Sequence, residues 1–251
     1  MLREDLVFGP IHSRRLGTSL GINILPSDGK VCNFDCIYCE CGWNADGRTG
    51  TPMPSASQVR SRLEDKLAQL MLDDVKLDSI TFSGTGEPTL NPEFPRIIED
   101  TVKLRDAYFP DVKVSVLTNA TRIVVPEIRE ALLKVDNPIL KLDASREWLA
   151  AKINRPAPGY DIRRIVEAMK LFKGEFILQT MFLRSPGFDS SDEENLTGWM
   201  DIVRSVHPRR IMVYTIDRPT PSRDLEKFSP ELMKALLAPL FAEGFDIQVR
   251  G

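Results

Sequence analysis

Short runs of β-forming residues alternate with longer amphipathic stretches along most of this chain. Apolar and β-branched runs predict strands at 19–25, 80–82, 112–117, 139–142, 176–183 and 210–216. Helical spacing predicts helices at 58–72, at 93–105, after 126, at 192–206 and at 230–242. Two more helices are predicted on either side of a break at 154–159, and the second of them covers 160–172. A last apolar run at 245–249 is expected to pad or close one edge of a sheet.

Six strand-then-helix units follow one another without a break in composition. This alternation predicts a parallel sheet with right-handed crossovers. Six units of about 35–40 residues each fill the chain, which leaves no room for a second domain. We therefore expect an α/β protein that forms a partial (βα)6, TIM-like barrel as a single domain over 1–251.

Composition and charge narrow the functional classes. The 251 residues are 42% hydrophobic and 27% charged, with a formal net charge of −3, so no global basic field is present and DNA binding is not expected. This charge still permits a local patch that binds tRNA. Neither a run of about 20 apolar residues nor a signal-peptide core at the N-terminus is found. We expect a soluble, cytoplasmic protein with no membrane partner.

All four cysteines lie in one stretch, VCNFDCIYCEC, directly after the first predicted strand. Cys32, Cys36 and Cys39 read C-x3-C-x2-C, and Tyr38 precedes the third. Three thiolates on one loop can hold three irons of an Fe–S cluster. A structural zinc site is the competing interpretation, but zinc sites take four Cys or His ligands that arrive as separated pairs. We favour the iron–sulfur interpretation, in which Cys41 is left over.

A second motif, Ser83-Gly84-Thr85-Gly86-Glu87-Pro88, follows the second predicted strand. Parallel strands place their carboxyl ends on one face, so this turn is expected on the same face as the cysteine loop. Glycines allow the backbone to approach a ligand closely. The Glu87 carboxylate suits an ammonium group. Taken alone, the motif also fits a simple strand-to-helix turn.

Together, the two motifs and the six βα units resemble the radical S-adenosylmethionine (SAM) superfamily. That resemblance implies an oxidoreductase in which Cys32, Cys36 and Cys39 ligate a [4Fe–4S] cluster whose fourth iron is chelated by SAM. It also implies anaerobic chemistry, in which SAM is cleaved reductively to a 5′-deoxyadenosyl radical that takes a hydrogen atom from a substrate. One departure is Gly84-Thr85-Gly86-Glu87, where the family has adjacent glycines before the acid.

The resemblance also implies roles for individual polar residues. Tyr38 is expected near the adenine of SAM, and Gly84, Gly86 and Glu87 at its methionine end. Further expected cofactor contacts are Asn119, Asp143, Ser145, Arg184 and Tyr214, with Gln179 and Thr180 as weaker candidates. Candidate substrate contacts are Arg14, Arg15, Asn23, Arg155 and Arg218. Each of these polar residues could also be a loop or capping residue.

GPIHSRRLGTSLGINILP, Ile153-Asn154-Arg155-Pro156 and Arg218-Pro219 resemble a compact subgroup of Fe–S oxidoreductases related to the tRNA wyosine-synthesis enzymes. Those tRNA enzymes carry extra cysteines and basic elements that this chain lacks. Cys41 alone cannot hold a second cluster, so it is either a bystander thiol, a hydrogen-atom donor or linked to the substrate.

Three substrate classes stay open. They are a small metabolite or nucleoside, a peptide or a protein that the enzyme activates, and tRNA. A local rim for tRNA would draw on Arg14, Arg15, Arg155, Arg163, Arg164, Arg209, Arg210 and Arg218. The resemblance further implies a one-electron reductant such as flavodoxin or ferredoxin.

Overall fold

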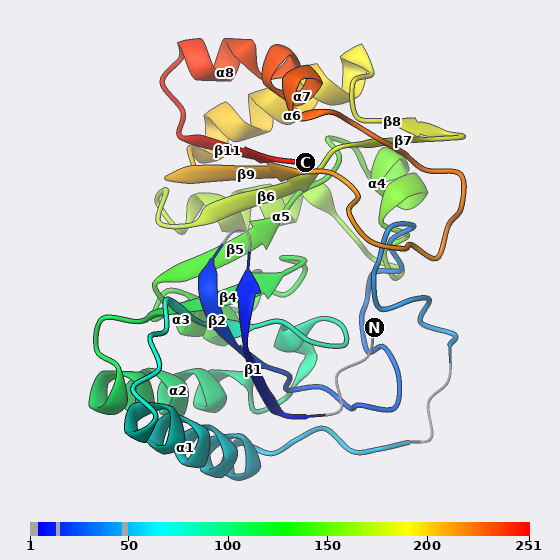
Figure 1. The fold of residues 1–251 in the computed structure, drawn as a ribbon. Helices are drawn as coiled ribbons and strands as arrows, with labels where there is room; N and C mark the ends of the chain where they lie inside the picture. The colour runs from blue at the N-terminus through cyan, green and yellow to red at the C-terminus, as the bar shows by residue number, and fades with distance from the viewer. Residues whose placement is uncertain (1–4, 14–15, 47–49) are drawn as a thin grey trace. The chain divides into compact units, whose positions relative to one another are not determined.

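A computed structural model of the chain describes residues 5–13, 16–46 and 50–251 (Figure 1). Arg14 and Arg15, two predicted substrate contacts, lie outside the described residues. The fold divides into two compact units. The first comprises Met1–Cys32, Asn44–Thr118 and Val125–Pro138, and the second comprises Asn33–Trp43, Asn119–Val124 and Ile139–Gly251.

The first unit is a twisted sheet of strands in the order β1-β2-β3-β4. β1 (Val7–Ser13) pairs antiparallel with β2 (Gly17–Ile22), and β2, β3 (Ser79–Phe82) and β4 (Lys113–Thr118) are parallel. The helices of this unit are α1 (Ala56–Leu72), α2 (Phe94–Tyr108), α3 (Pro126–Leu132) and the short 3-10 helix η1 (Pro88–Leu90). Ser55 and Gln58 form a capping box at the start of α1.

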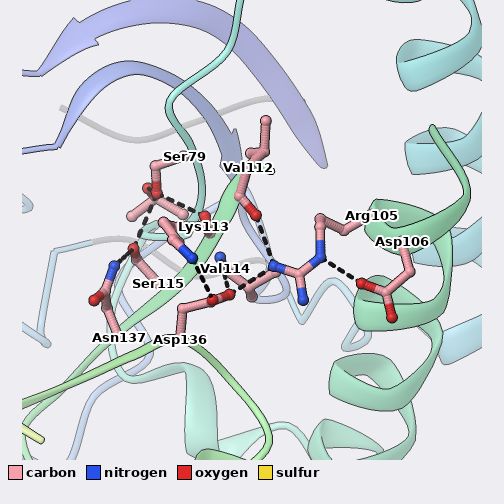
Figure 2. Close-up of polar contacts among 10 residues, drawn as sticks. Ser79, Arg105, Asp106, Val112, Lys113, Val114, Ser115, Asp136 and Asn137 are labelled. Atoms are coloured by element: carbon pink, nitrogen blue, oxygen red, sulfur yellow. Dashed lines mark hydrogen bonds and ion pairs between the residues drawn. The ribbon is translucent and has the colours of Figure 1, made fainter. Parts of the chain in front are cut away.

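The two faces of this sheet differ in chemistry because neighbouring side chains on a strand alternate between them. Leu20, Ile80 and Val114 lie in register on one face and are fully buried. The other face carries hydroxyl groups that bond to one another: Ser19 Oγ lies 2.7 Å from Thr81 Oγ1, and Ser79 Oγ lies 2.9 Å from Ser115 Oγ. Asn137 extends the row by donating from Nδ2 to Ser115 Oγ at 3.0 Å (Figure 2). These four hydroxyl residues are therefore buried with their hydrogen bonds made.

Arg105 and Asp136 join α2 to the start of β4 (Figure 2). Arg105 donates from Nη1 to Asp136 Oδ2 and to the Val112 carbonyl, both at 2.6 Å. Asp136 also accepts from the backbone N–H of Val114 at 2.9 Å. Burial, which raises the pKa of Asp136, is outweighed by the hydrogen bonds from Val114 and Arg105, so this pKa lies below its usual value.

The second unit contains a parallel sheet in the order β5-β6-β9-β11. Its strands are β5 (Asn137–Lys141, of which the first two residues belong to the first unit), β6 (Ile177–Met181), β9 (Arg210–Tyr214) and β11 (Ile247–Arg250). Its helices are α4 (Glu147–Ile153), α5 (Ile162–Lys170), α6 (Glu193–Val206), α7 (Pro230–Leu236) and α8 (Ala238–Ala242). A small antiparallel sheet consists of β7 (Leu183–Ser185), β8 (Phe188–Asp189) and β10 (Glu226–Lys227).

The predicted α/β class is confirmed, with several corrections of detail. The strand expected at 176–183 is two strands, because β6 ends at Met181 and β7 turns away to pair with β8 and β10. The helix expected at 230–242 breaks at Leu237, two residues before Pro239, which has no N–H to continue a helix. The final apolar run forms β11, a further parallel strand. In the part of the chain that the structure describes, no helix combines the length and the apolar character needed to span a membrane.

Candidate active site

The cysteine loop of the second unit is fastened to the turn that follows α4. Asp35 and Ile37 donate their backbone N–H groups to the carbonyls of Asn154 and Ile153, at 2.8 and 3.0 Å. In return Ala157 donates to the Asn33 carbonyl at 2.8 Å. The Ile153–Ala157 segment thus runs beside the loop. Backbone bonds of this kind hold a loop in one shape without restricting its side chains.

Cys36 is the buried member of the cysteine set. Its sulfur lies 3.4 Å from Nδ2 of Asn154, which donates a hydrogen bond to it. Burial raises the pKa of the Cys36 thiol to about 11. Cys39 is half-buried and closes a tight turn, with its N–H on the Cys36 carbonyl at 3.1 Å. None of the four cysteines forms a disulfide with another described residue.

Asp143, just beyond the end of β5, accepts hydrogen bonds from three residues. It is buried and accepts hydrogen bonds from the Tyr38 hydroxyl, from Asn154 Nδ2 at 2.7 Å and from the Met181 N–H at 2.8 Å. Burial, together with the charge of Asp143, holds the pKa of Tyr38 well above its usual value. Tyr38 of the cysteine motif is therefore hydrogen-bonded to Asp143, the residue after β5 that the sequence had marked as a candidate cofactor contact.

Lys141 belongs to this group and was missed from the sequence. Its ammonium donates to the hydroxyls of Tyr38 at 2.8 Å and Tyr214 at 3.1 Å, and lies 3.7 Å from Asp143 Oδ2. Burial alone would lower the pKa of Lys141, but the Asp143 charge outweighs it and raises that pKa. Strand alternation was the available signal, because residues two apart share a face and Lys141 precedes Asp143 by two.

Asn119 lies next to the cysteine loop through a second polar cluster. It donates from Nδ2 to Asn33 Oδ1 at 2.7 Å, and Asn33 donates in turn to Thr121 Oγ1 at 2.7 Å. Asn33 directly follows Cys32 in sequence, and nothing local marked it as important. A pocket of about 160 Å³ opens at this point, lined by Asn33, Thr121, Pro156, Tyr160 and Arg164 among others.

In the first unit, the glycine turn packs against the segment that leads into Cys32. Val31 donates its N–H to the Thr85 carbonyl at 2.8 Å, and Glu87 donates to the Val31 carbonyl at 2.9 Å. Gly86 has φ +145°, and a Cβ there would lie 1.9 Å from the Val31 carbonyl oxygen. A Cβ on Gly84 would lie 2.0 Å from Asn23 Oδ1. Both glycines are thus required by close approach of the protein's own chain.

The carboxylate of Glu87 accepts its hydrogen bonds from residues of the first unit. Its side chain is buried, and Oε1 accepts from the Thr89 N–H at 3.1 Å, from Thr89 Oγ1 at 2.6 Å and from Thr118 Oγ1 at 2.7 Å. Glu87 therefore caps η1 and ties the turn to the end of β4. Asn23 acts in a similar way, because its Oδ1 accepts from the Thr85 N–H at 3.3 Å.

The remaining predicted residues are dispersed. Ser145 is buried and donates its N–H to Asn195 Oδ1 at 3.0 Å. Arg184 is exposed and paired with Asp189 and Glu226, and Arg218 is paired with Glu40. The guanidinium of Arg155 lies over the Trp43 ring, 4.7 Å from its centroid. Gln179 and Thr180 are buried in β6, and Cys41 is half-buried.

The donor set fits an iron–sulfur cluster by its chemistry. Three cysteines that form no disulfide with another described residue occur within the stretch 32–39, and soft thiolates are the ligands that Fe–S clusters take. Cys32 belongs to the first unit, and Cys36 and Cys39 to the second. Among the described residues, no three Cys, His, Asp or Glu side chains are gathered as a metal site.

Comparison with known families decides the wider assignment. The family model described as the radical SAM superfamily matches residues 27–201, which include both the cysteine loop and the glycine turn. This chain belongs to the radical SAM superfamily. It is a radical SAM enzyme, as its two motifs predicted.

Relatives of the chain come from several organisms. A UPF0026 protein of Methanocaldococcus jannaschii is 30% identical over 93% of this chain and 70% of its own length. A UPF0026 protein of Synechocystis is 32% identical over 88% of this chain and 79% of its own. A Brachyspira hyodysenteriae protein named GTPase Obg is 31% identical over 93% of this chain, which spans only 33% of that protein.

Solved structures share the fold at low sequence identity. Streptococcus suis SuiB bound to S-adenosylmethionine is 18% identical, with a TM-score of 0.64 over 92% of this chain and 50% of SuiB. A radical SAM methyltransferase from Sphaerobacter thermophilus is 16% identical, with a TM-score of 0.69 over 92% of this chain and 65% of the methyltransferase. The chain thus spans half to two thirds of these proteins. The predicted partial barrel with a mostly parallel sheet is confirmed, whereas membership of the wyosine-related subgroup and the single-domain boundary stay predictions.

Proposed function

We propose that this radical SAM enzyme carries a [4Fe–4S] cluster on Cys32, Cys36 and Cys39, which leaves one iron for SAM. When bound, the cluster supplies the electron that splits SAM into methionine and a 5′-deoxyadenosyl radical, which takes a hydrogen atom from the substrate. The C-x3-C-x2-C spacing and the family match support this assignment.

One observation carries the proposal furthest. Tyr38, from the cysteine motif, and Asn154, which bonds to Cys36, both donate to the single carboxylate of Asp143. A motif side chain, a cysteine sulfur and the polar end of a parallel strand are thus linked in one buried network. Polar residues at the carboxyl ends of parallel strands are where proteins of this architecture place their chemistry.

We assign roles to the chain's own residues on this basis. The Gly84–Gly86 turn would hold the methionine end of SAM through its backbone groups, while its glycines make room for Asn23 and Val31 of the chain itself. The Glu87 carboxylate, fixed by Thr89 and Thr118, would add negative charge for the ammonium group. Tyr38, Asn119, Asp143, Ser145 and Tyr214 would contact the adenosine part. Tyr38 and Asp143 are also buried, which suits a site that must exclude water from a reactive radical.

A second substrate class has a specific observation in its favour. Arg155, Arg163 and Arg164 are exposed in the second unit, and within the described part of the chain none of them forms an ion pair. Unpaired arginines bind phosphate well, so modification of tRNA is the second candidate beside a small metabolite, nucleoside or peptide. Binding to tRNA that weakens steeply with salt would support it. We expect a cytoplasmic one-electron donor such as flavodoxin or ferredoxin for either substrate class.

The test is metal and sulfide analysis of protein purified without oxygen. We expect about four irons and four sulfides per chain, and 5′-deoxyadenosine on reduction with SAM. Cys32→Ala should lose both, whereas Cys41→Ala, changed only two residues beyond Cys39, should keep the cluster. Zinc in place of iron, or loss of the cluster in Cys41→Ala, would contradict the assignment. Deuterium transfer from labelled metabolites, peptides or tRNA to 5′-deoxyadenosine would then identify the substrate.

A further inference from the structure

Both the backbone N–H and the backbone carbonyl of Asn154 form hydrogen bonds. It forms the C-terminal cap of α4, with its N–H on the Ala150 carbonyl at 2.7 Å, and its own carbonyl accepts from the Asp35 N–H at 2.8 Å. The residue is 2% exposed. Its side chain therefore starts from a fixed point between α4 and the cysteine loop.

The amide nitrogen of Asn154 carries two hydrogens and has two acceptors. Nδ2 lies 2.7 Å from Asp143 Oδ2 and 3.4 Å from the Cys36 sulfur. The flipped amide would set its oxygen against the Asp143 carboxylate, so the orientation with nitrogen toward both acceptors is the favourable one. Asp143 is itself fixed by the N–H of Met181 at 2.8 Å, which anchors the network to β6.

We propose that Asn154 is a positioning residue that donates an N–H to the Cys36 sulfur and thereby raises the reduction potential of the cluster. This inference rests on the ligation by Cys36 proposed above. Hydrogen bonds to the sulfurs are one of the factors that set the potential of an Fe–S cluster. Reduction adds negative charge to the cluster and its thiolates, so a donor at sulfur stabilises the reduced form more than the oxidised form.

A neutral amide is a suitable hydrogen-bond donor to the Cys36 sulfur. An arginine or lysine at the same place would add a full charge beside Asp143, whereas Asn154 supplies a donor and leaves the charge balance unchanged. A sulfur acceptor in a buried site also gains more from a hydrogen bond than one in water, because the local dielectric is low. The effect should thus be seen in the potential more than in the affinity for iron.

The test compares Asn154→Leu with the wild type after cluster reconstitution, in a redox titration followed by electron paramagnetic resonance without SAM. Leucine has a similar size and no donor. We expect about a tenfold smaller equilibrium constant for reduction, which is a fall of about 59 mV for one electron. Asn91→Leu is the control, because Asn91 is equally buried but donates to the carbonyls of Ile24 and Pro54 in the first unit. It should leave the potential unchanged.

The outcomes distinguish the role of Asn154 from the ligation of the cluster by Cys36, on which that role rests. A wild type that takes up no cluster contradicts the ligation itself. A cluster in both proteins with equal potentials contradicts only the role of Asn154. If Asn154→Leu fails to fold, wild-type protein labelled with ¹⁵N at the asparagine side chains decides the matter. A hyperfine coupling of an asparagine side-chain nitrogen to the reduced cluster is expected, and its absence would overturn the inference.

Discussion

Thr118 donates a hydrogen bond from Oγ1 to Glu87 Oε1 at 2.7 Å. This contact joins the last residue of β4 to the turn after β3, two strand ends that are far apart in sequence. Glu87 needs such donors because a buried carboxylate is costly unless hydrogen bonds satisfy it. Glu87 therefore holds the turn to the end of β4, in addition to the negative charge that it would offer to SAM.

Thr118→Val should lower the free energy of unfolding of the cluster-free chain by about 1–3 kcal/mol, since it leaves a buried charged acceptor short of a donor. Binding of SAM to the reconstituted enzyme should weaken as well, because the turn loses an anchor. Urea unfolding and equilibrium dialysis with SAM measure the two effects. The matched control is Thr101→Val, because Thr101 in α2 is equally buried and its Oγ1 has no hydrogen-bond partner among the described residues. That change should be neutral or stabilising, and an equal loss in both variants would contradict the role of Thr118.

Gly86→Ala should disrupt the turn more than backbone strain alone would. The new Cβ would lie 1.9 Å from the Val31 carbonyl oxygen, so the bonds of Val31 to the turn would have to open. We expect a loss of SAM binding of at least about tenfold. Gly244→Ala is the control, because Gly244 also has a positive φ of +87°, yet a Cβ there would meet no atom of the described residues within 4 Å beyond its own chain neighbours. If both variants bind SAM alike, the close approach to Val31 is not what the glycine provides.

Sequence reasoning found most elements because hydrophobic periodicity follows burial. The parallel strands and the helices were predicted from it. β1 was missed because Gly9 and Pro10 interrupt its β-forming residues, whereas the structure accommodates them in an edge strand whose register shifts between Phe8 and Ile11. The small sheet of β7, β8 and β10 was also missed, because strands of two or three residues are too short to show alternation.

The candidate site was predictable only where a motif marks it. Cys36, Tyr38 and Asp143 were selected from the sequence, and the structure brings Tyr38 and Asp143 into direct contact. Lys141 and the side chain of Asn154 were not selected, because their importance arises from a contact with residues about 100 positions away. The spacing of Lys141 and Asp143 places the lysine on the same strand face, but only the fold shows which distant residues it meets.

Asp136→Asn should remove a pH-dependent part of the stability. The folded-state pKa of Asp136 lies below its usual value, so its stabilising contribution is complete above the unfolded pKa of about 3.9 and is lost as the pH falls through the folded value. The difference in unfolding free energy between wild type and Asp136→Asn should be about 1–3 kcal/mol at pH 7. It should shrink steadily below about pH 4. A difference that stays constant from pH 7 to pH 3 would show that the charge of Asp136 contributes nothing.

Lys141→Met tests the buried network of the second unit. Removing the ammonium leaves Asp143 without the nearby cation and Tyr38 and Tyr214 without a shared donor, so we expect a loss of about 2–5 kcal/mol in the unfolding free energy of the cluster-free chain. Asp143→Asn alone should also destabilise, because Tyr38 and Asn154 would lose a charged acceptor. The double variant should be more stable than the sum of the two losses predicts, since neither charge is then left unbalanced. Strict additivity in urea unfolding would mean that Lys141 and Asp143 act independently, and the ammonium would then serve only the two tyrosine hydroxyls.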